Sequence, residues 1–110
     1  MAEAGTRTRS ASLAPYEVIW NDKFVSKIEE KRGVSTDEVE EVLFSRPHVR
    51  RAEKGKVKGE HLYVAYGQTA AGRYLVVFFL RKPRSAALPV SAREMTRAER
   101  RYFHEQKEAG

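Results

Sequence analysis

The sequence predicts an α+β domain in which two N-terminal helices and one C-terminal helix pack on a small antiparallel sheet. Capping patterns mark the start of each helix, strand-like apolar runs lie between the second and third helix, and the connections between those runs are short. This order favours a single sheet of three to four strands covered by helices. The chain of 110 residues is long enough for one domain with a modest core. We assign 16–106 to the domain, 1–15 to a disordered basic arm and 107–110 to a tail.

The two N-terminal helices have clear start and stop signals. Asn21 is a typical N-cap, apolar residues follow it at helical spacing, and Gly33 supplies a left-handed residue that ends the helix. Ser35 and Glu38 then form a capping box for a second helix, which Pro47 stops. We therefore expect two consecutive short helices.

The strands are predicted from β-branched and aromatic runs between turns. A short strand is expected at 16–20, and further strands at 49–53, 61–66, 73–81 and 87–91. The segment 73–81 is apolar on both faces, which places it in the centre of the sheet. Pro89 has no backbone N–H, so the last strand is an edge strand or carries a bulge. A helix over 96–106 closes the chain, and Thr96 and Glu99 form its capping box.

Composition limits the classes of function. With 21 Lys+Arg against 15 Asp+Glu, the net charge of +6 favours a polyanionic partner. The absence of Cys excludes a disulfide, a thiolate nucleophile and a Cys-based zinc site. No ligand-spaced His or carboxylate cluster is present, so we expect no metal and no cofactor. No apolar run is long enough for a membrane span and no secretory leader is evident, so we expect a cytoplasmic protein.

Arginines gather where the last strand meets the last helix. Arg93, Arg97, Arg100 and Arg101 surround the capping box that begins at Thr96. A helix N-terminus flanked by guanidiniums is a place where a phosphate binds. This cluster therefore predicts a surface that faces RNA.

Two segments carry a resemblance to a known family. They are Tyr66-Gly67-x-Thr69-x-x-Gly72-Arg73-x-Leu75-Val76-Val77 and Ser91-Ala92-Arg93-x-x-Thr96-x-x-Glu99-x-x-Tyr102. Together with the order of elements, they make 16–103 resemble the BrnT toxins. The resemblance implies a RelE-like fold and the toxin of a type II toxin–antitoxin system, a metal-independent endoribonuclease that cleaves RNA and inhibits translation. It also implies a ribbon–helix–helix antitoxin as partner, with DNA bound only through the complex of the two.

Metal-free RNA cleavage needs a base, cations that stabilise the charged phosphorane, and an acid. His61, at the start of a strand, is the first candidate base, although it could be an ordinary surface histidine. Arg73 and Arg93 hold the family positions and could bind a phosphate. Glu99 caps the helix and could also orient an arginine or act as a base. The Tyr102 ring could stack on an RNA nucleobase, its hydroxyl could donate a hydrogen bond, or the ring could pack on the sheet.

Other basic residues add positive charge that could attract RNA. The predicted RNA-binding residues are Lys54, Lys56 and Lys58 of one loop, with Arg81 and Arg97. His48 and His104 are weaker catalytic candidates.

A catalytically weak relative that binds only RNA or its antitoxin is the alternative, because Leu62 and Leu88 stand where the family pattern has basic residues. A protein that binds DNA alone ranks last, because the second helix is acidic.

Overall fold

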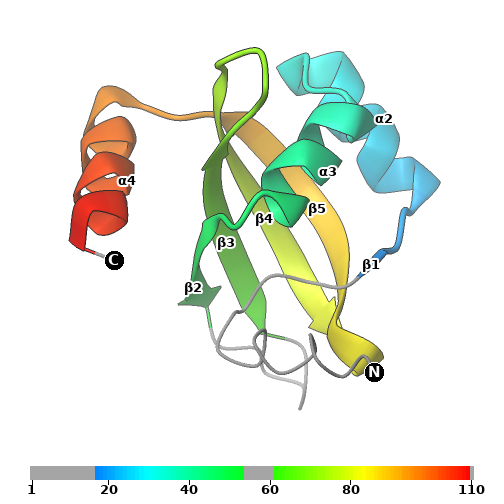
Figure 1. The fold of residues 1–110 in the computed structure, drawn as a ribbon. Helices are drawn as coiled ribbons and strands as arrows, with labels where there is room; N and C mark the ends of the chain where they lie inside the picture. Colours follow the sequence, from blue (N-terminus) through cyan, green and yellow to red (C-terminus); the bar gives the residue numbers. More distant parts are fainter. Residues whose placement is uncertain (1–16, 54–60, 110) are drawn as a thin grey trace, which may run out of the picture.

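A computed structural model describes residues 17–53 and 61–109. Its elements are β1 (Glu17–Val18), α2 (Asp22–Arg32), α3 (Thr36–Phe44), β2 (His48–Glu53), β3 (Leu62–Gln68), β4 (Tyr74–Lys82), a 3-10 turn (Pro83–Ser85), β5 (Ala86–Glu94) and α4 (Arg97–Ala109) (Figure 1). The predicted arm over 1–15 and the lysines Lys54, Lys56 and Lys58 lie outside the described residues. None of the described helices is long and apolar enough to cross a membrane.

The sheet is larger than the sequence predicts and is mixed. It has five strands in the order β1-β5-β4-β3-β2. β2 to β5 form four antiparallel strands, as the sequence predicts, but β1 adds a fifth strand that pairs with β5 in parallel through Glu17 and Ala86. β1 is only two residues long and its partner lies at the far end of the chain. A strand this short shows no apolar period, so only the folded chain reveals the pairing.

The helix signals are confirmed by the structure. The Asn21 side chain accepts a hydrogen bond from the Lys23 N–H, and Gly33 ends α2 with a φ of 64°. Ser35 and Glu38 form a complete capping box at the start of α3. α4 continues to Ala109, beyond the predicted end at residue 106.

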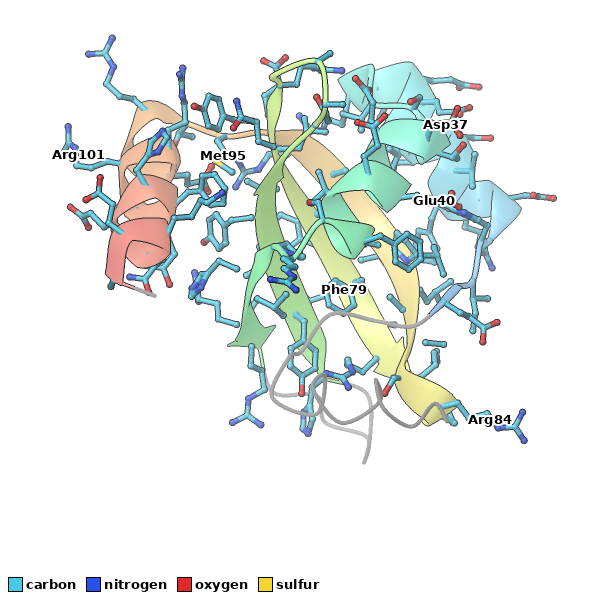
Figure 2. All side chains as sticks on the ribbon, in the orientation of Figure 1. Asp37, Glu40, Phe79, Arg84, Met95 and Arg101 are labelled. Atoms are coloured by element: carbon cyan, nitrogen blue, oxygen red, sulfur yellow. The ribbon has the colours of Figure 1, made fainter. Side chains whose placement is uncertain are left out.

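The helices cover both faces of the sheet (Figure 1). α2 and α3 pack on one face, where Ile28, Leu43 and Phe79 are fully buried; Figure 2 shows Phe79 between these helices and the sheet. α4 lies against the other face over a smaller core that contains Tyr66 and Phe103. Because side chains alternate along a strand, neighbouring residues pack into different cores. Burial of each large apolar side chain stabilises the folded state by about 1.5–3 kcal/mol.

Pro89 occupies the irregular part of β5. Phe78 pairs with Ser91 whereas Phe79 pairs with Pro89, which leaves Val90 as an extra residue. The prediction of a bulge is confirmed. On the outer side of β5, β1 pairs only with Ala86 and Ala87, so the missing N–H of Pro89 interrupts no ladder there.

Candidate active site

A row of paired residues crosses four strands on the face that α4 partly covers. His48 of β2 pairs with Tyr66 of β3, Tyr66 pairs with Val76 of β4, and Val76 pairs with Arg93 of β5. Residues at paired positions project from the same face of a sheet. The register therefore places a histidine beside a tyrosine, with an arginine on the same face two strands further on, although the three are distant in sequence.

His48 is half-buried against two tyrosine rings. Its Nε2 lies 2.8 Å from the hydroxyl of Tyr102 on α4, and its ring centre lies 6.0 Å from that of Tyr66. Burial lowers the pKa of His48 below its ordinary value of 6.5, and the positive charge of Arg50 lowers it further. At neutral pH the imidazole is therefore uncharged, which is the form that accepts a proton.

Arg50 lies two residues further along β2 and faces the same side. Its guanidinium donates a hydrogen bond of 3.1 Å to the Tyr66 hydroxyl and lies 6.0 Å from the centre of the Tyr102 ring. The hydrogen bond with Tyr66 is the main cause that raises the pKa of Arg50. Tyr66 is only 4% exposed, so this bond also satisfies a buried hydroxyl. The result is a fixed positive charge beside the His48 imidazole.

Arg93 forms a two-pronged ion pair with Glu99. Its Nη1 and Nη2 lie 2.7 and 2.8 Å from the two carboxylate oxygens, and Nη1 also donates to the Glu94 carbonyl. Glu99 in turn accepts the Thr96 N–H at 2.8 Å and caps α4. The hydrogen bonds from Arg93 are the main reason that the pKa of Glu99 falls from 4.5 to about 2. Nε and the second Nη2 hydrogen of Arg93 are not used in these contacts and remain for a phosphate.

The arrangement contains the groups that acid–base cleavage of a phosphodiester needs. The patch combines a neutral imidazole, a phenol hydrogen-bonded to it and two guanidiniums. The imidazole can accept a proton, and the guanidiniums can stabilise charge that develops on phosphate oxygens. Among the described residues, no group of His, Cys, Asp and Glu side chains could hold a metal ion.

Three of the predicted catalytic residues meet in this patch. Arg93, Glu99 and Tyr102 all lie on the α4 side of the sheet. Glu99 makes the contacts of two of its three predicted roles, because it caps the helix and holds an arginine. Tyr102 combines two of its alternatives, since its ring packs against Tyr66 while its hydroxyl contacts His48.

The structure places His61 and Arg73 away from the patch. His61 precedes Tyr66 by five residues along β3, a separation of roughly 16 Å at strand geometry. Arg73 lies on the opposite face of the sheet, where it contacts Glu38 at 2.8 Å and Glu94 at 3.0 Å. Arg73 and Arg93 therefore do not share a phosphate pocket, and each is paired with a carboxylate.

The described members of the predicted RNA-binding set are also separated. Arg81 lies 5.5 Å from the centre of the Tyr63 ring, which packs against the core under α2 and α3. Arg97 is exposed at the start of α4, on the side of the candidate active site.

From the sequence, Arg50 counts only as a background charge, Tyr66 only as part of the family motif, and His48 as a weaker candidate. One signal was present, because His48 and Arg50 are two residues apart and share a face if the segment is a strand. The strand was predicted to begin at residue 49, which left His48 in a loop. The position of Tyr66 opposite His48 depends on the register of two strands, which no local pattern specifies.

Comparison with known proteins identifies the family. The family model described as "Ribonuclease toxin, BrnT, of type II toxin-antitoxin system" matches residues 20–99. The crystal structure of the Brucella abortus ribonuclease toxin BrnT is similar, with a TM-score of 0.54 and 17% sequence identity over 74% of this chain and 97% of that chain. The search of curated proteins finds no match. Because the family model covers well over half of the sequence, this chain belongs to the BrnT ribonuclease toxins of type II toxin–antitoxin systems.

Proposed function

We propose that this toxin is a metal-independent endoribonuclease that inhibits translation by cutting RNA, and that His48, Arg50, Arg93 and Tyr102 carry the reaction. One observation carries the proposal: a half-buried neutral imidazole is hydrogen-bonded to a phenol beside the Arg50 guanidinium, on the sheet face that also carries Arg93. The family supports RNA as the substrate, because its model describes a ribonuclease toxin.

The proposed step uses only side chains of this patch. His48 accepts the proton of a ribose 2′-hydroxyl, whose oxygen attacks the adjacent phosphorus. The bond from phosphorus to the 5′-oxygen breaks, and the Tyr102 hydroxyl donates a proton to that leaving oxygen. Tyr102 recovers its proton from His48 through the 2.8 Å contact between them. The products are a 2′,3′-cyclic phosphate and a 5′-hydroxyl, while Arg50 and Arg93 stabilise the phosphorane.

The roles of His61 and Arg73 differ from those expected from the sequence. His61 lies directly before β3, five residues before Tyr66, whereas His48 is the histidine that contacts Tyr102, and Arg73 contacts Glu38 on the α3 side of the sheet. The proposal therefore leaves both outside the reaction and assigns the base to His48.

Membership of a type II family implies an antitoxin as partner. We infer that this antitoxin is a ribbon–helix–helix protein and that the pair binds DNA through it. The charge of α3 supports the assignment of DNA binding to the antitoxin. Asp37 and Glu41 are exposed on this helix and would repel a phosphate backbone.

The test is cleavage of single-stranded RNA by the purified toxin in the presence of EDTA. We expect cut RNA with 2′,3′-cyclic phosphate ends, and a loss of about 10²- to 10⁴-fold in kcat for His48→Ala. His61→Ala is the matched control and should cut like the wild type. Unchanged cleavage by His48→Ala, or cleavage abolished by EDTA, would contradict the proposal.

A binding module without catalysis is the second candidate, and the tight ion pair of Arg93 with Glu99 favours it. In that case the wild type would bind RNA or antitoxin but leave RNA intact under every condition. Expression in growing cells would then leave translation unimpaired.

A further inference from the structure

A polar pocket opens beside the candidate active site, at the corner where the chain passes from α3 into β2. Its volume is about 140 Å³. Three of its lining residues, Pro47, Gly67 and Phe103, are direct chain neighbours of active-site residues. Gly67 packs so closely under α3 that a Cβ there would lie 2.8 Å from a methyl group of Val42, so this side of the pocket is rigid. A group held here would lie next to one held by His48.

The pocket carries positive charge from two different elements. Arg46 enters from the end of α3 and Lys107 from α4, and none of the described lining residues is acidic. Lys107 lies 5.4 Å from the centre of the Phe103 ring, and no ion pair joins Arg46 to a described carboxylate. Two cations that converge on a polar hollow favour an anion.

The backbone at Arg46 has a left-handed conformation. Arg46 has a φ of 61°, in the left-handed region that favours glycine. The preceding helix ends in the same conformation with Gly33, whose φ is 64°. Just past the end of α3, Arg46 takes this conformation at the mouth of the pocket, where its side chain lines the wall.

We propose that this pocket is a subsite for the phosphate of the RNA nucleotide next to the scissile bond, with Arg46 and Lys107 as its cationic contacts. The inference rests on the proposed ribonuclease function. The pocket is too small for a whole nucleotide but has room for a phosphate group and ordered water. The subsite would fix the register of the strand, so that the neighbouring phosphate lies between His48 and Arg93.

The chain supplies a matched control for the test. Arg84 has a φ of 66° and lies at the far end of the sheet from α4 (Figure 2). Arg46→Gly and Arg84→Gly therefore remove the same charge and relieve the same backbone strain, but only the first changes the pocket. Neither variant should lower Tm, because glycine suits this conformation.

The measurement is the Kd of an uncleavable single-stranded 2′-O-methyl RNA across a salt series. We expect Arg46→Gly to weaken binding roughly tenfold and to reduce the salt slope by about 0.7, while Arg84→Gly binds like the wild type. Lys107→Ala should weaken binding in the same direction. Equal Kd values for the Arg46 and Arg84 variants would overturn the subsite and leave Arg46 as a partner of the α3 carbonyls.

The proposed cleavage reaction is scored separately with ordinary RNA. If the wild type leaves ordinary RNA intact while Arg46→Gly still weakens binding of the 2′-O-methyl strand, the nuclease proposal fails and the phosphate subsite stands. If the wild type cuts RNA and Arg46→Gly changes neither KM nor Kd, the subsite fails and the nuclease proposal stands.

Discussion

Glu99 connects the stability of α4 with the position of the Arg93 guanidinium. The same carboxylate accepts the Thr96 N–H at the start of the helix and both Nη atoms of Arg93. Its side chain is 22% exposed, so the ion pair is partly shielded from water. A carboxylate with a pKa of about 2 is a poor base at neutral pH, and its charge instead fixes the guanidinium in place.

The depressed pKa of Glu99 predicts a loss of stability in acid. A carboxyl group whose pKa is lower in the folded chain stabilises the fold above its ordinary value of 4.5, and this stabilisation disappears as the pH falls toward about 2. We expect Glu99→Gln to lower the free energy of unfolding by about 1–2 kcal/mol at pH 7, after allowance for solvent screening. Denaturant unfolding at pH values from 7 to 2.5 measures the effect.

The variant should also flatten the pH dependence over the interval from 4.5 to 2. Glu105→Gln, on an exposed position of the same helix, is the control and should unfold like the wild type. An acid transition that is identical in Glu99→Gln and the wild type would show that Arg93 does not stabilise the Glu99 carboxylate.

Among the elements, the helices are predictable from sequence and the pairing of the strands is not. Asn21, Ser35 and Thr96 each act on a backbone N–H within three residues, so their capping patterns are visible in a short window. The pairing of β1 with β5 and of His48 with Tyr66 joins distant segments. The candidate active site depends on these pairings, which is why the sequence identified its α4 and β5 side but missed β2.

Arg73 makes hydrogen bonds to three elements on the α2 and α3 face. Its guanidinium contacts Glu38 at the start of α3, the Gly33 carbonyl after α2 and Glu94 at the end of β5. The backbone N–H of Ser35 is the main cause that lowers the pKa of Glu38, and Arg73 lowers it further. Structural contacts alone therefore explain why an arginine stands at this position of the family pattern. Loss of the Arg73 guanidinium would leave its hydrogen-bond partners unsatisfied.

We therefore predict that Arg73→Gln lowers the stability of the fold and leaves the rate of RNA cleavage unchanged. The free energy of unfolding should fall by about 1–2 kcal/mol, because Glu38 loses its cation. The kcat for RNA cleavage, measured well below Tm, should stay at the wild-type value. Arg32→Gln, at an exposed position near the end of α2, is the control and should leave both quantities unchanged. A stable Arg73→Gln protein that no longer cuts RNA would place Arg73 in the reaction after all.

At the scale of the whole molecule, α3 is the acidic helix, whereas α2 and α4 carry charges of both signs. The exposed acidic residues of α2 and α3 include Asp22, Glu29, Glu30 and Asp37. Figure 2 shows Asp37 on the helix side of the sheet and Arg101 on the outer side of α4. The acidic charge of α3 opposes the approach of RNA from its side of the sheet, whereas Arg50 and Arg93 on the α4 side favour it.

This polarity predicts a strong dependence of cleavage on salt. If Arg46, Arg50, Arg93 and Lys107 each neutralise one phosphate, log kcat/KM should fall with log salt with a slope of about −2 to −3, at roughly 0.7 per phosphate on a single strand. Arg50→Gln should reduce the magnitude of the slope by about 0.7, since it removes one of these cations.

The control for the salt series is Arg84→Gln, at the end of the sheet remote from α4, which removes the same charge and should keep the wild-type slope. If both variants lowered the slope equally, the net charge of the chain would determine RNA affinity rather than the two cations of the patch and the two of the pocket. A wild-type slope near zero would contradict the docking of RNA on the α4 face, because phosphate contacts on a polyanion always release counterions.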